Sequence, residues 1–294
     1  MSSSLISLGS NLGNVRESMN AAKRMLSEIY GPTNLRFSQL YRTPPVGGPS
    51  GQKEFLNAAV SIQSQSSAWE IWETIKHIEL SLGRQRQLRW ESRRIDIDLL
   101  LHNRQRIWTP HLKVPHPRMC MRSFILKPAC EIASDWIDPV TEWSLSDLWK
   151  HLEWCRTSDS YLRVICEDQR HGRRLMEAFR QSDPGGEVSV QWEVLEIGNP
   201  RTVIHNEDGR GLKLSIFAVA TPDPMNVLWE DYSLPWARWL NLSGDGTIAP
   251  AVGPLVQGPR YLMPSNDLDW TLHEIRAASE AMQSWIEVSE PFEP

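Results

Sequence analysis

The order of hydrophobic patterns in the first half of the chain restricts its fold more than any other feature of the sequence. Residues 4–10 form a short apolar stretch that predicts a strand ending at Gly9. A helix should follow, because apolar residues then recur at steps of four and three, Asn14 can cap the start with Glu17 three places on, and Gly31 before a proline stops it. The apolar residues of this helix are Val15, Met19, Ala22, Leu26 and Ile29.

Three more strands and two more helices are predicted before residue 134. The strands are expected at 34–44, which leads into a Gly-rich loop, at 55–63 and at 95–102, and the helices at 67–82, opened by a capping box, and at 118–133, interrupted near Pro128. Residues 104–117 are rich in turn formers. The order β-α-β-β-α-β is the split βαβ arrangement, in which helices pack on one face of an antiparallel sheet. We therefore expect an N-terminal α+β domain.

The character of the sequence changes near residue 156, after which strands and helices alternate in a new pattern. With 294 residues the chain is long enough for two domains, which we expect at 1–158 and 159–294. The second half predicts an α/β layered domain, with strands in 161–168, 188–197, 212–220 and 259–264 and helices in 172–181 and 269–282. It contains neither a P-loop nor a GxGxxG motif.

The composition excludes several functional classes. A formal net charge of -5 argues against a general nucleic-acid or anionic-membrane binder. The four cysteines form no CxxC pair and predict reduced thiols rather than a disulfide framework. Neither a signal peptide nor an apolar run of about 20 residues is present in the sequence, so we expect a cytoplasmic protein.

Two acidic residues, Asp96 and Asp98, lie one position apart in the strand predicted at 95–102. Residues two apart in a strand point to the same face, so the two carboxylates should lie side by side. Two such groups repel each other by roughly 1 to 4 kcal/mol at about 4 Å, and a cation between them relieves this repulsion. Mg²⁺ is usually held by one or two carboxylates together with substrate phosphates. The alternative is a solvated strand face on which the aspartates pair with neighbouring arginines.

Five arginines precede the aspartates within eleven residues, and they are Arg84, Arg86, Arg89, Arg93 and Arg94. A guanidinium group is permanently charged and its planar fork of donors fits phosphate oxygens. Alone, such a run is typical of a solvated surface. Next to the carboxylate pair it predicts a site for a nucleoside triphosphate and its metal ions, of a kind that uses no P-loop.

Four further residues are candidates for a ligand site, one of them for a leaving oxygen and three for a flat polar ring. His116 can donate a proton or a hydrogen bond to a leaving oxygen, although a histidine between two prolines is also a common turn residue. Asn57 lies among apolar neighbours and needs hydrogen-bond partners. A heterocycle stacked between Phe55 and Phe124 and bonded by this amide would satisfy all three residues, although both rings also fit a core.

These residues resemble those of a known family, 6-hydroxymethyl-7,8-dihydropterin pyrophosphokinase. The resemblance covers residues 1–155 and rests on five ordered motifs, LGSNLG, YRTPPVGG, FLNAAV, IELSLGRQRQLRWESRRIDIDLLL and VPHPRMCMRSFILKPACEIA. It implies a ferredoxin-like fold and the transfer of a pyrophosphoryl group from ATP to the hydroxymethyl oxygen of the pterin in folate biosynthesis, with release of AMP. Residues 159–294 match no family that we recognise from the sequence.

The resemblance also implies roles for individual residues. Asp96 and Asp98 would hold two Mg²⁺ ions, and Arg84, Arg93 and His116 would join them in catalysis. The implied pterin-binding residues are Thr43, Pro44, Val46, Phe55, Asn57, Arg122 and Phe124. The expected ATP-binding residues are Glu79, Arg84, Arg86, Arg93, Leu99, His111, Lys113 and His116. Gly9, Ser10 and Asn11 match the opening motif of the family and would be mainly structural.

One alternative function stays open at this point, a non-catalytic protein that keeps the fold and uses the arginine-rich loop to bind RNA or another polyanion. A pure polyanion binder gains nothing from two carboxylates inside a basic site, which favours the enzyme. We expect ATP and the pterin as ligands, and neither nucleic acid nor a membrane as partner. The oligomeric state and the role of the second half do not follow from the sequence.

Overall fold

A computed structural model describes all of the chain except residues 47–50, 84–92, 110, 158–160, 167–168, 184, 187, 195–211, 220–258, 265–266 and 293–294. The chain divides into two compact units. The first consists of Met1–Trp108, Leu112–Trp149 and Gln283–Pro294, and the second of Thr109–His111 and Lys150–Met282. This division differs from the expected boundary at residue 158, because the end of the chain returns to the first unit and because the change of unit falls within a helix.

The first unit is built on an antiparallel sheet in which the described strands are ordered β12-β3-β4-β1-β5, with β2 also paired to β4. Its strands are β1 (Ser2–Ser10), β2 (Leu35–Phe37), β3 (Leu40–Thr43), β4 (Phe55–Ser64), β5 (Asp96–His102) and β12 (Glu287–Glu290). Its helices are α1 (Val15–Tyr30), α2 (Ala68–Ser81) and α3 (Ser123–Ala133), and α4 (Leu145–Thr157) begins in it. Short elements complete the unit, namely η1 (Pro32–Asn34), β6 (Ile107–Trp108), β7 (Lys113–Val114) and η2 (Met119–Met121).

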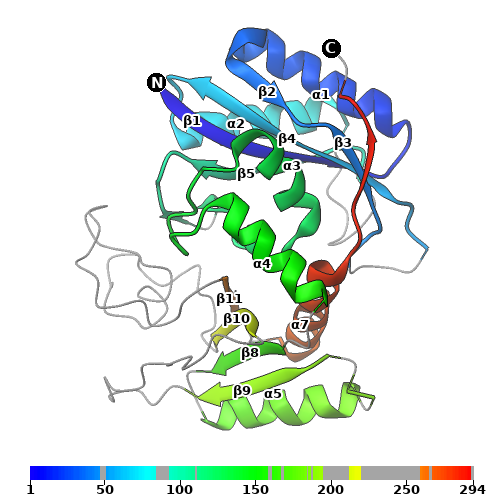
Figure 1. Cartoon of the computed structure of the whole chain (residues 1–294), viewed down its shortest axis with the longest axis vertical. Helices are drawn as coiled ribbons and strands as arrows, with labels where there is room; N and C mark the ends of the chain where they lie inside the picture. The colour runs from blue at the N-terminus through cyan, green and yellow to red at the C-terminus, as the bar shows by residue number, and fades with distance from the viewer. Residues whose placement is uncertain are drawn as a thin grey trace. The chain divides into compact units, whose positions relative to one another are not determined.

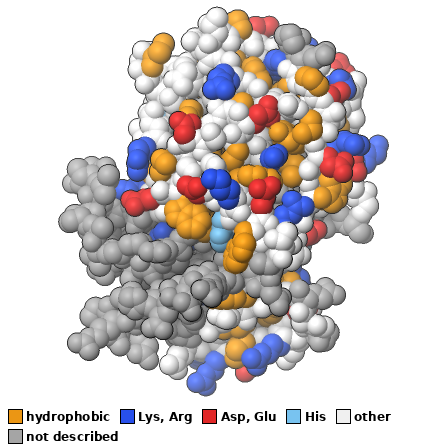
Figure 2. All heavy atoms as spheres, in the orientation of Figure 1, with side chains coloured by type: hydrophobic (Ala, Val, Ile, Leu, Met, Phe, Trp, Pro, Cys, Tyr) orange, Lys and Arg blue, Asp and Glu red, His pale blue; other side chains and the backbone are white. Residues whose placement is uncertain are grey.

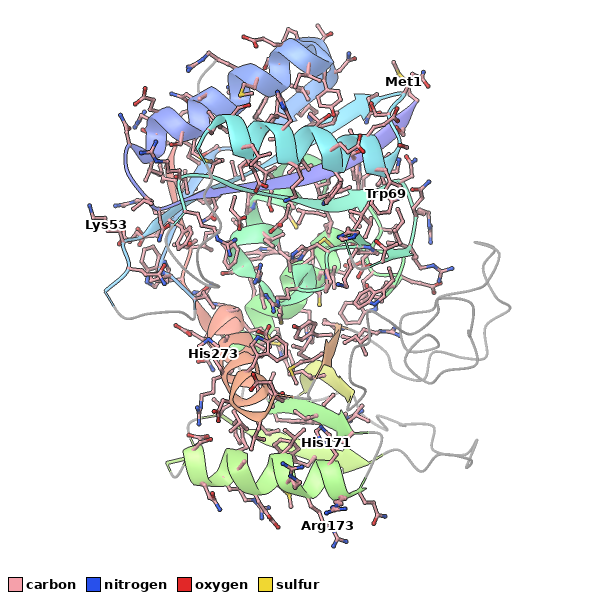
Figure 3. The ribbon with its side chains drawn as sticks, turned by 180° about the vertical axis from the view of Figure 1, so that it is seen from behind. Met1, Lys53, Trp69, His171, Arg173 and His273 are labelled. Atoms are coloured by element: carbon pink, nitrogen blue, oxygen red, sulfur yellow. The ribbon has the colours of Figure 1, made fainter. Side chains whose placement is uncertain are left out.

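Helices α1 and α2 cover one face of this sheet, and α3 covers the other (Figure 1 and Figure 3). The core under α1 and α2 contains Ile6 and Leu8 of β1, Ile97 of β5 and residues such as Leu26 and Ile75 from the two helices. The two helices of the predicted β-α-β-β-α-β order thus share one face, and α3, which lies outside that order, packs on the other. The mixed α+β class of the N-terminal region is confirmed.

The predicted starts of α1 and α2 are confirmed in detail, whereas the helix expected from residue 118 begins at Ser123 as α3. The Asn14 side chain accepts a hydrogen bond from the backbone N–H of Glu17, and Ser67 and Glu70 form the reciprocal capping box of α2. Helix α1 ends at Gly31, whose φ of 80° lies in the left-handed region that glycine adopts without strain.

Two local predictions are wrong. The strand expected at 34–44 is divided into β2 and β3 at Ser38. The backbone N–H of Ala59 donates to the Ser38 hydroxyl group, whereas in a continuous strand it would donate to the Ser38 carbonyl. The helix around Pro128 is not interrupted, since α3 runs through this residue. An internal proline removes one helical hydrogen bond and crowds the carbonyl four residues earlier, and the burial of Pro128 with its apolar neighbours in α3 offsets this cost.

The second unit contains a parallel sheet whose described strands are ordered β11-β10-β8-β9. The strands are β8 (Tyr161–Cys166), β9 (Val190–Val194), β10 (Leu212–Val219) and β11 (Arg260–Pro264), and the helices are α5 (Gln169–Ser182) and α7 (Leu268–Gln283). Phe179 of α5 packs edge-on against Trp192 of β9, and Tyr261 of β11 donates a hydrogen bond to Glu274 of α7 at 3.0 Å. Trp192 and Tyr261 share a face through the strand register, so both helices cover the same face of the sheet.

The surface of the first unit carries both signs of charge. Figure 2 shows Lys and Arg side chains interspersed with Asp and Glu side chains over the visible face of this unit. None of the helices in the described part of the chain is both long enough and apolar enough to span a bilayer.

Candidate active site

The strand register brings three predicted site residues into one row across the sheet. Gly9 of β1 pairs with Asn57 of β4 on one side and with Asp96 of β5 on the other. Directly paired residues project to the same face. Ile97 and Leu99 belong to the core under α1 and α2, so the row and Asp98 project to the opposite face. The amide predicted for the pterin and the carboxylates predicted for metal therefore share one face, with only a glycine between them.

Asp96 and Asp98 are neighbours on this face and both reach solvent, with 23% and 35% of their side chains exposed. Asp96 forms an ion pair with Arg93, and Asp98 Oδ2 lies 3.7 Å from His116 Nε2. Among the described residues no group of three or more His, Cys, Asp and Glu side chains is close enough to form a metal site by itself. Two accessible carboxylates form the partial oxygen donor set that Mg²⁺ completes with phosphate oxygens and water. The donor set fits the expected metal.

The LGSN motif at the end of β1 holds the arginine that contacts Asp96. The backbone N–H groups of Asn11 and Leu12 both donate to the carbonyl of Arg93, and the Asn11 side-chain oxygen accepts the Arg93 N–H at 2.8 Å. Ser10 donates its hydroxyl hydrogen bond to the carbonyl of Arg94. These bonds fix the point at which the chain enters β5, so the structural role expected for Ser10 and Asn11 also positions a predicted catalytic arginine.

His116 is held in a defined orientation beside β5. Its backbone N–H donates to the carbonyl of Leu100 at 2.9 Å, and its Nδ1 accepts the backbone N–H of Arg118 at 3.2 Å. Burial lowers the pKa of His116 well below its usual value, and the charges of Arg122 and Arg118 lower it further. The imidazole is thus neutral near pH 7, and because Nδ1 is an acceptor, its proton lies on Nε2, the nitrogen nearest Asp98.

Asn57 is almost completely buried, with 4% of its surface exposed, and it donates a hydrogen bond from Nδ2 to Thr43 Oγ1 at 2.9 Å. Its Oδ1 lies over Gly9, where an added Cβ atom would approach to 3.2 Å. Because Gly9 has no side chain, there is room for the Asn57 amide. Phe55 at the start of β4 is half-buried, as are Pro44 and Val46 in the segment that follows β3.

Phe124 and Arg122 lie where helix α3 begins. The Arg122 guanidinium lies over the Phe124 ring, 5.3 Å from its centroid, and both side chains are half-buried. The positive charge of Arg122 also lowers the pKa of His116. The face under α3 thus combines aromatic, amide, guanidinium and carboxylate groups.

The side chains of Glu79 and Leu99, both expected to bind ATP, are buried. Glu79 is buried on α2, where its carboxylate accepts the backbone N–H of Ile97 at 2.9 Å and the Lys76 ammonium at 2.8 Å. Leu99 is 5% exposed and lies in the core under α1 and α2. Glu79 supports the strand between the two aspartates, and the Leu99 side chain packs away from them.

The remaining predicted residues divide into two groups. Arg84 and Arg86, together with Arg89, fall outside the described residues. The charge of Lys113 contributes to the low pKa of His116, and its ammonium lies 5.3 Å from the centroid of the Trp108 ring. His111 is exposed and is grouped with the second unit.

Sequence reasoning missed three contributions to this site. The backbone of Arg118 sets the proton position of His116, the backbone of Ile97 is the partner of Glu79, and the side chain of Asn11 holds Arg93. Only Asn11 carried a signal in the sequence, a polar residue directly after an apolar strand. The other two contacts involve backbone groups, which residue types do not reveal.

Comparison with known proteins identifies the family of the first unit. Residues 5–134 match the family model for 7,8-dihydro-6-hydroxymethylpterin-pyrophosphokinase (HPPK). The 2-amino-4-hydroxy-6-hydroxymethyldihydropteridine pyrophosphokinase of Bacillus subtilis (strain 168) is 42% identical over 127 residues, which cover 43% of this chain and 75% of that protein. The protein of the same name from Haemophilus influenzae is 34% identical over 139 residues, 47% of this chain and 86% of that protein.

A crystal structure of wild-type HPPK-DHPS from Plasmodium falciparum is 12% identical, with a TM-score of 0.39, and the similarity covers 75% of this chain and 64% of that chain. The two sequence relatives are each more than 30% identical, and this chain spans at least 75% of both. The expected family and activity are therefore confirmed, and the chain belongs to the HPPK family of ATP-dependent pyrophosphokinases in folate biosynthesis.

Proposed function

We propose that the face of the sheet carrying Asn57, Gly9 and Asp96 binds 6-hydroxymethyl-7,8-dihydropterin and ATP side by side and transfers the pyrophosphoryl group between them. The strand register that aligns these three residues is the observation that carries the proposal. This alignment supports a pterin that forms hydrogen bonds with the Asn57 amide at one end and meets a metal-bound phosphate of ATP at the other. In this reaction the hydroxymethyl group of the pterin lies between these two ends.

The pterin ring would lie against Asn57. A buried amide requires hydrogen-bond partners, and the edge of a pterin offers both donors and acceptors. Thr43 already fixes one end of the amide, so a ligand gains a prepared partner at little entropic cost. Phe55 and Phe124 would stack on the two faces of the ring, and Pro44 and Val46 would line its rim, with Arg122 at the phosphate side.

Asp96 and Asp98 would hold the two Mg²⁺ ions that accompany ATP. When bound, the ions would neutralise phosphate charge and make the β-phosphorus more electrophilic. The aspartates themselves would orient the nucleophile, because an Asp96 oxygen lies in the same row as the proposed pterin amide. The proton of the attacking hydroxyl group would pass to Asp96 and from there to water.

Arg93 and His116 would bind the triphosphate. The Arg93 guanidinium is held near Asp96 by the LGSN motif and can turn a second nitrogen toward a phosphate oxygen. The neutral His116 would donate a hydrogen bond from Nε2 rather than a proton, since its pKa lies well below 7. We further propose that Arg84 and Arg86 join this set, with adenosine contacts from His111, Lys113 and the backbone of Leu99.

The proposed reaction forms one bond to phosphorus and breaks one. The hydroxymethyl oxygen forms a bond to the β-phosphorus of ATP, the bond from that phosphorus to the oxygen of the α-phosphate breaks, and AMP leaves with the bridging oxygen. The protein supplies position and charge neutralisation rather than a covalent intermediate.

A coupled assay for AMP tests this proposal with the full-length chain. AMP formation should require the pterin, ATP and Mg²⁺ together, and Asp96→Asn and Asp98→Asn should each reduce kcat by roughly 10³-fold or more, because about 4 kcal/mol of metal-mediated stabilisation is lost. Asp135→Asn, the same change at an exposed aspartate beyond α3, should retain full activity. AMP formation without pterin, or wild-type turnover in both site variants, would contradict the assignment.

A further inference from the structure

Residues 284–292, which we call the strap, are built into the first unit although they follow the whole second unit in the sequence. β12 pairs antiparallel with β3 along the edge of the sheet, as Figure 1 shows. The family match ends at residue 134, and the two relatives described above align with less than half of this chain. The strap is thus an addition to the part of the chain that resembles them.

The far end of the strap is anchored in the hydrophobic core. Phe292 is 7% exposed and belongs to the cluster under α1 and α2, where its ring contacts that of Phe37 edge-on with centroids 5.4 Å apart. The Lys23 ammonium donates to the Phe292 carbonyl and lies 4.8 Å from the centroid of its ring. Glu290 forms an ion pair with Arg16 of α1. An aromatic side chain buried in this way indicates a fixed segment rather than a loose terminus.

The near end of the strap is anchored beside the proposed pterin site. Ser284 Oγ lies 2.8 Å from Ser123 Oγ, and both residues are buried. Ser123 is the first residue of α3 and stands between Arg122 and Phe124 in the chain. One wall of the proposed pterin site therefore begins at a contact with the strap.

The middle of the strap pairs with β3, which forms the other wall of the proposed pterin site. Val288 pairs with Tyr41 of β3, and Tyr41 pairs with Asn57. The row that contains Asn57, Gly9 and Asp96 thus extends without a break to the strap. Two residues beyond Tyr41, Thr43 accepts the hydrogen bond that orients the Asn57 amide. β3 lies between β4 and β12, so the strap closes the edge from which this short strand would otherwise be free to move.

We propose that the strap is a positioning element of the pterin site, which holds β3 and the start of α3 at the separation that the pterin requires. This inference rests on the proposed function, since it takes the pterin to bind between these two walls. It assigns to the C-terminal residues a part in binding one substrate and none in binding the other. ATP is expected at Asp96 and Asp98 on β5, at the opposite edge of the sheet from β12.

A proline at position 288 tests the proposal in the full-length chain. Val288 is 54% exposed, so Val288→Pro disturbs the pairing of β12 without opening the core. The KM for the pterin should rise roughly fivefold to tenfold, the range expected when one orienting hydrogen bond is lost, while the KM for ATP stays within about twofold. Hydrogen exchange at the amides of β3 reports whether the pairing has been released.

Two further variants separate positioning from general destabilisation. Val190→Pro makes the same change in β9, which like β11 is at an edge of the described sheet of the second unit, and should leave both KM values unchanged. Arg16→Glu sets two carboxylates against each other at the surface anchor and should raise the pterin KM about twofold to threefold, and Glu290→Arg in the same chain should restore it.

The outcomes are distinct. Faster exchange in β3 with an unchanged pterin KM would overturn the role of the strap. A parallel rise of both KM values, or an equal rise in Val190→Pro, would overturn it as well. The absence of pterin-dependent AMP from the unmodified chain would instead contradict the proposed function.

Discussion

Glu79 offers a sharp test of how α2 supports the metal-binding strand. Among the described strands β5 is the last of its sheet, so in this part of the chain the N–H groups on its outer edge pair with no further strand. The carboxylate of Glu79, 1% exposed, accepts one of them, the N–H of Ile97 between Asp96 and Asp98. Glu79→Ala should leave that buried donor unsatisfied, at a cost of about 1–3 kcal/mol. The Lys76 side chain is 27% exposed and can turn to water, so the loss of its ion pair with Glu79 adds little to this cost.

Hydrogen exchange at the Ile97 amide measures this cost where it arises. A loss of about 1–3 kcal/mol corresponds to roughly 5-fold to 150-fold faster exchange through local opening. Glu79→Gln retains an acceptor oxygen and should increase the rate by less than about tenfold. Glu73→Ala, the same truncation on the exposed side of α2, should leave the rate unchanged. Unchanged protection of Ile97 in Glu79→Ala would refute the reasoning, and we also expect this variant to need several-fold more Mg²⁺ for half-maximal activity.

Three other predictions follow from single contacts. Gly9→Ala should raise the pterin KM roughly threefold to tenfold in steady-state assays, because the new Cβ would lie 3.2 Å from Asn57 Oδ1, and an unaltered KM would show that the amide has room to move. In NMR titrations of the nucleotide-free protein, the His116 ring signals should stay constant from pH 8 to pH 6, whereas a midpoint near 6.5 would contradict its burial as a neutral group. Burial and Glu131 raise the pKa of Tyr41. The neutral phenol therefore stabilises the fold fully below pH 10, and this contribution is lost as the pH rises from there through the raised pKa. Urea unfolding should show a lower midpoint at pH 10.5 than at pH 8.

Local signals account for what the sequence predicted well. The capping box of α2 needs only Ser67 and Glu70, three residues apart, and the shared face of Asp96 and Asp98 follows from the two-residue period of a strand. The family resemblance assigned separate roles to Asn57 and Asp96, and the sequence did not predict that they lie in one row. Its geometry depends on the register of β1 with both neighbours, which no local pattern encodes.

The strap shows where prediction from the sequence fails. Residues 284–292 include one buried aromatic and a short polar strand, a pattern equally typical of an exposed terminus. The place of Phe292 in the core depends on space left between Phe37 and Lys23, more than 250 residues earlier in the chain. The same reasoning applies to Ser38, whose hydroxyl divides a predicted strand by bonding a residue of β4.

Binding of Mn²⁺, measured by electron paramagnetic resonance with an unreactive ATP analogue, tests the assignment of the metal site most directly. The full-length chain should bind two Mn²⁺ ions with the nucleotide, and Asp96→Asn and Asp98→Asn should each lose at least one of them, while Asp135→Asn binds both. Equal occupancy and affinity in all four proteins would show that these carboxylates do not hold the metal.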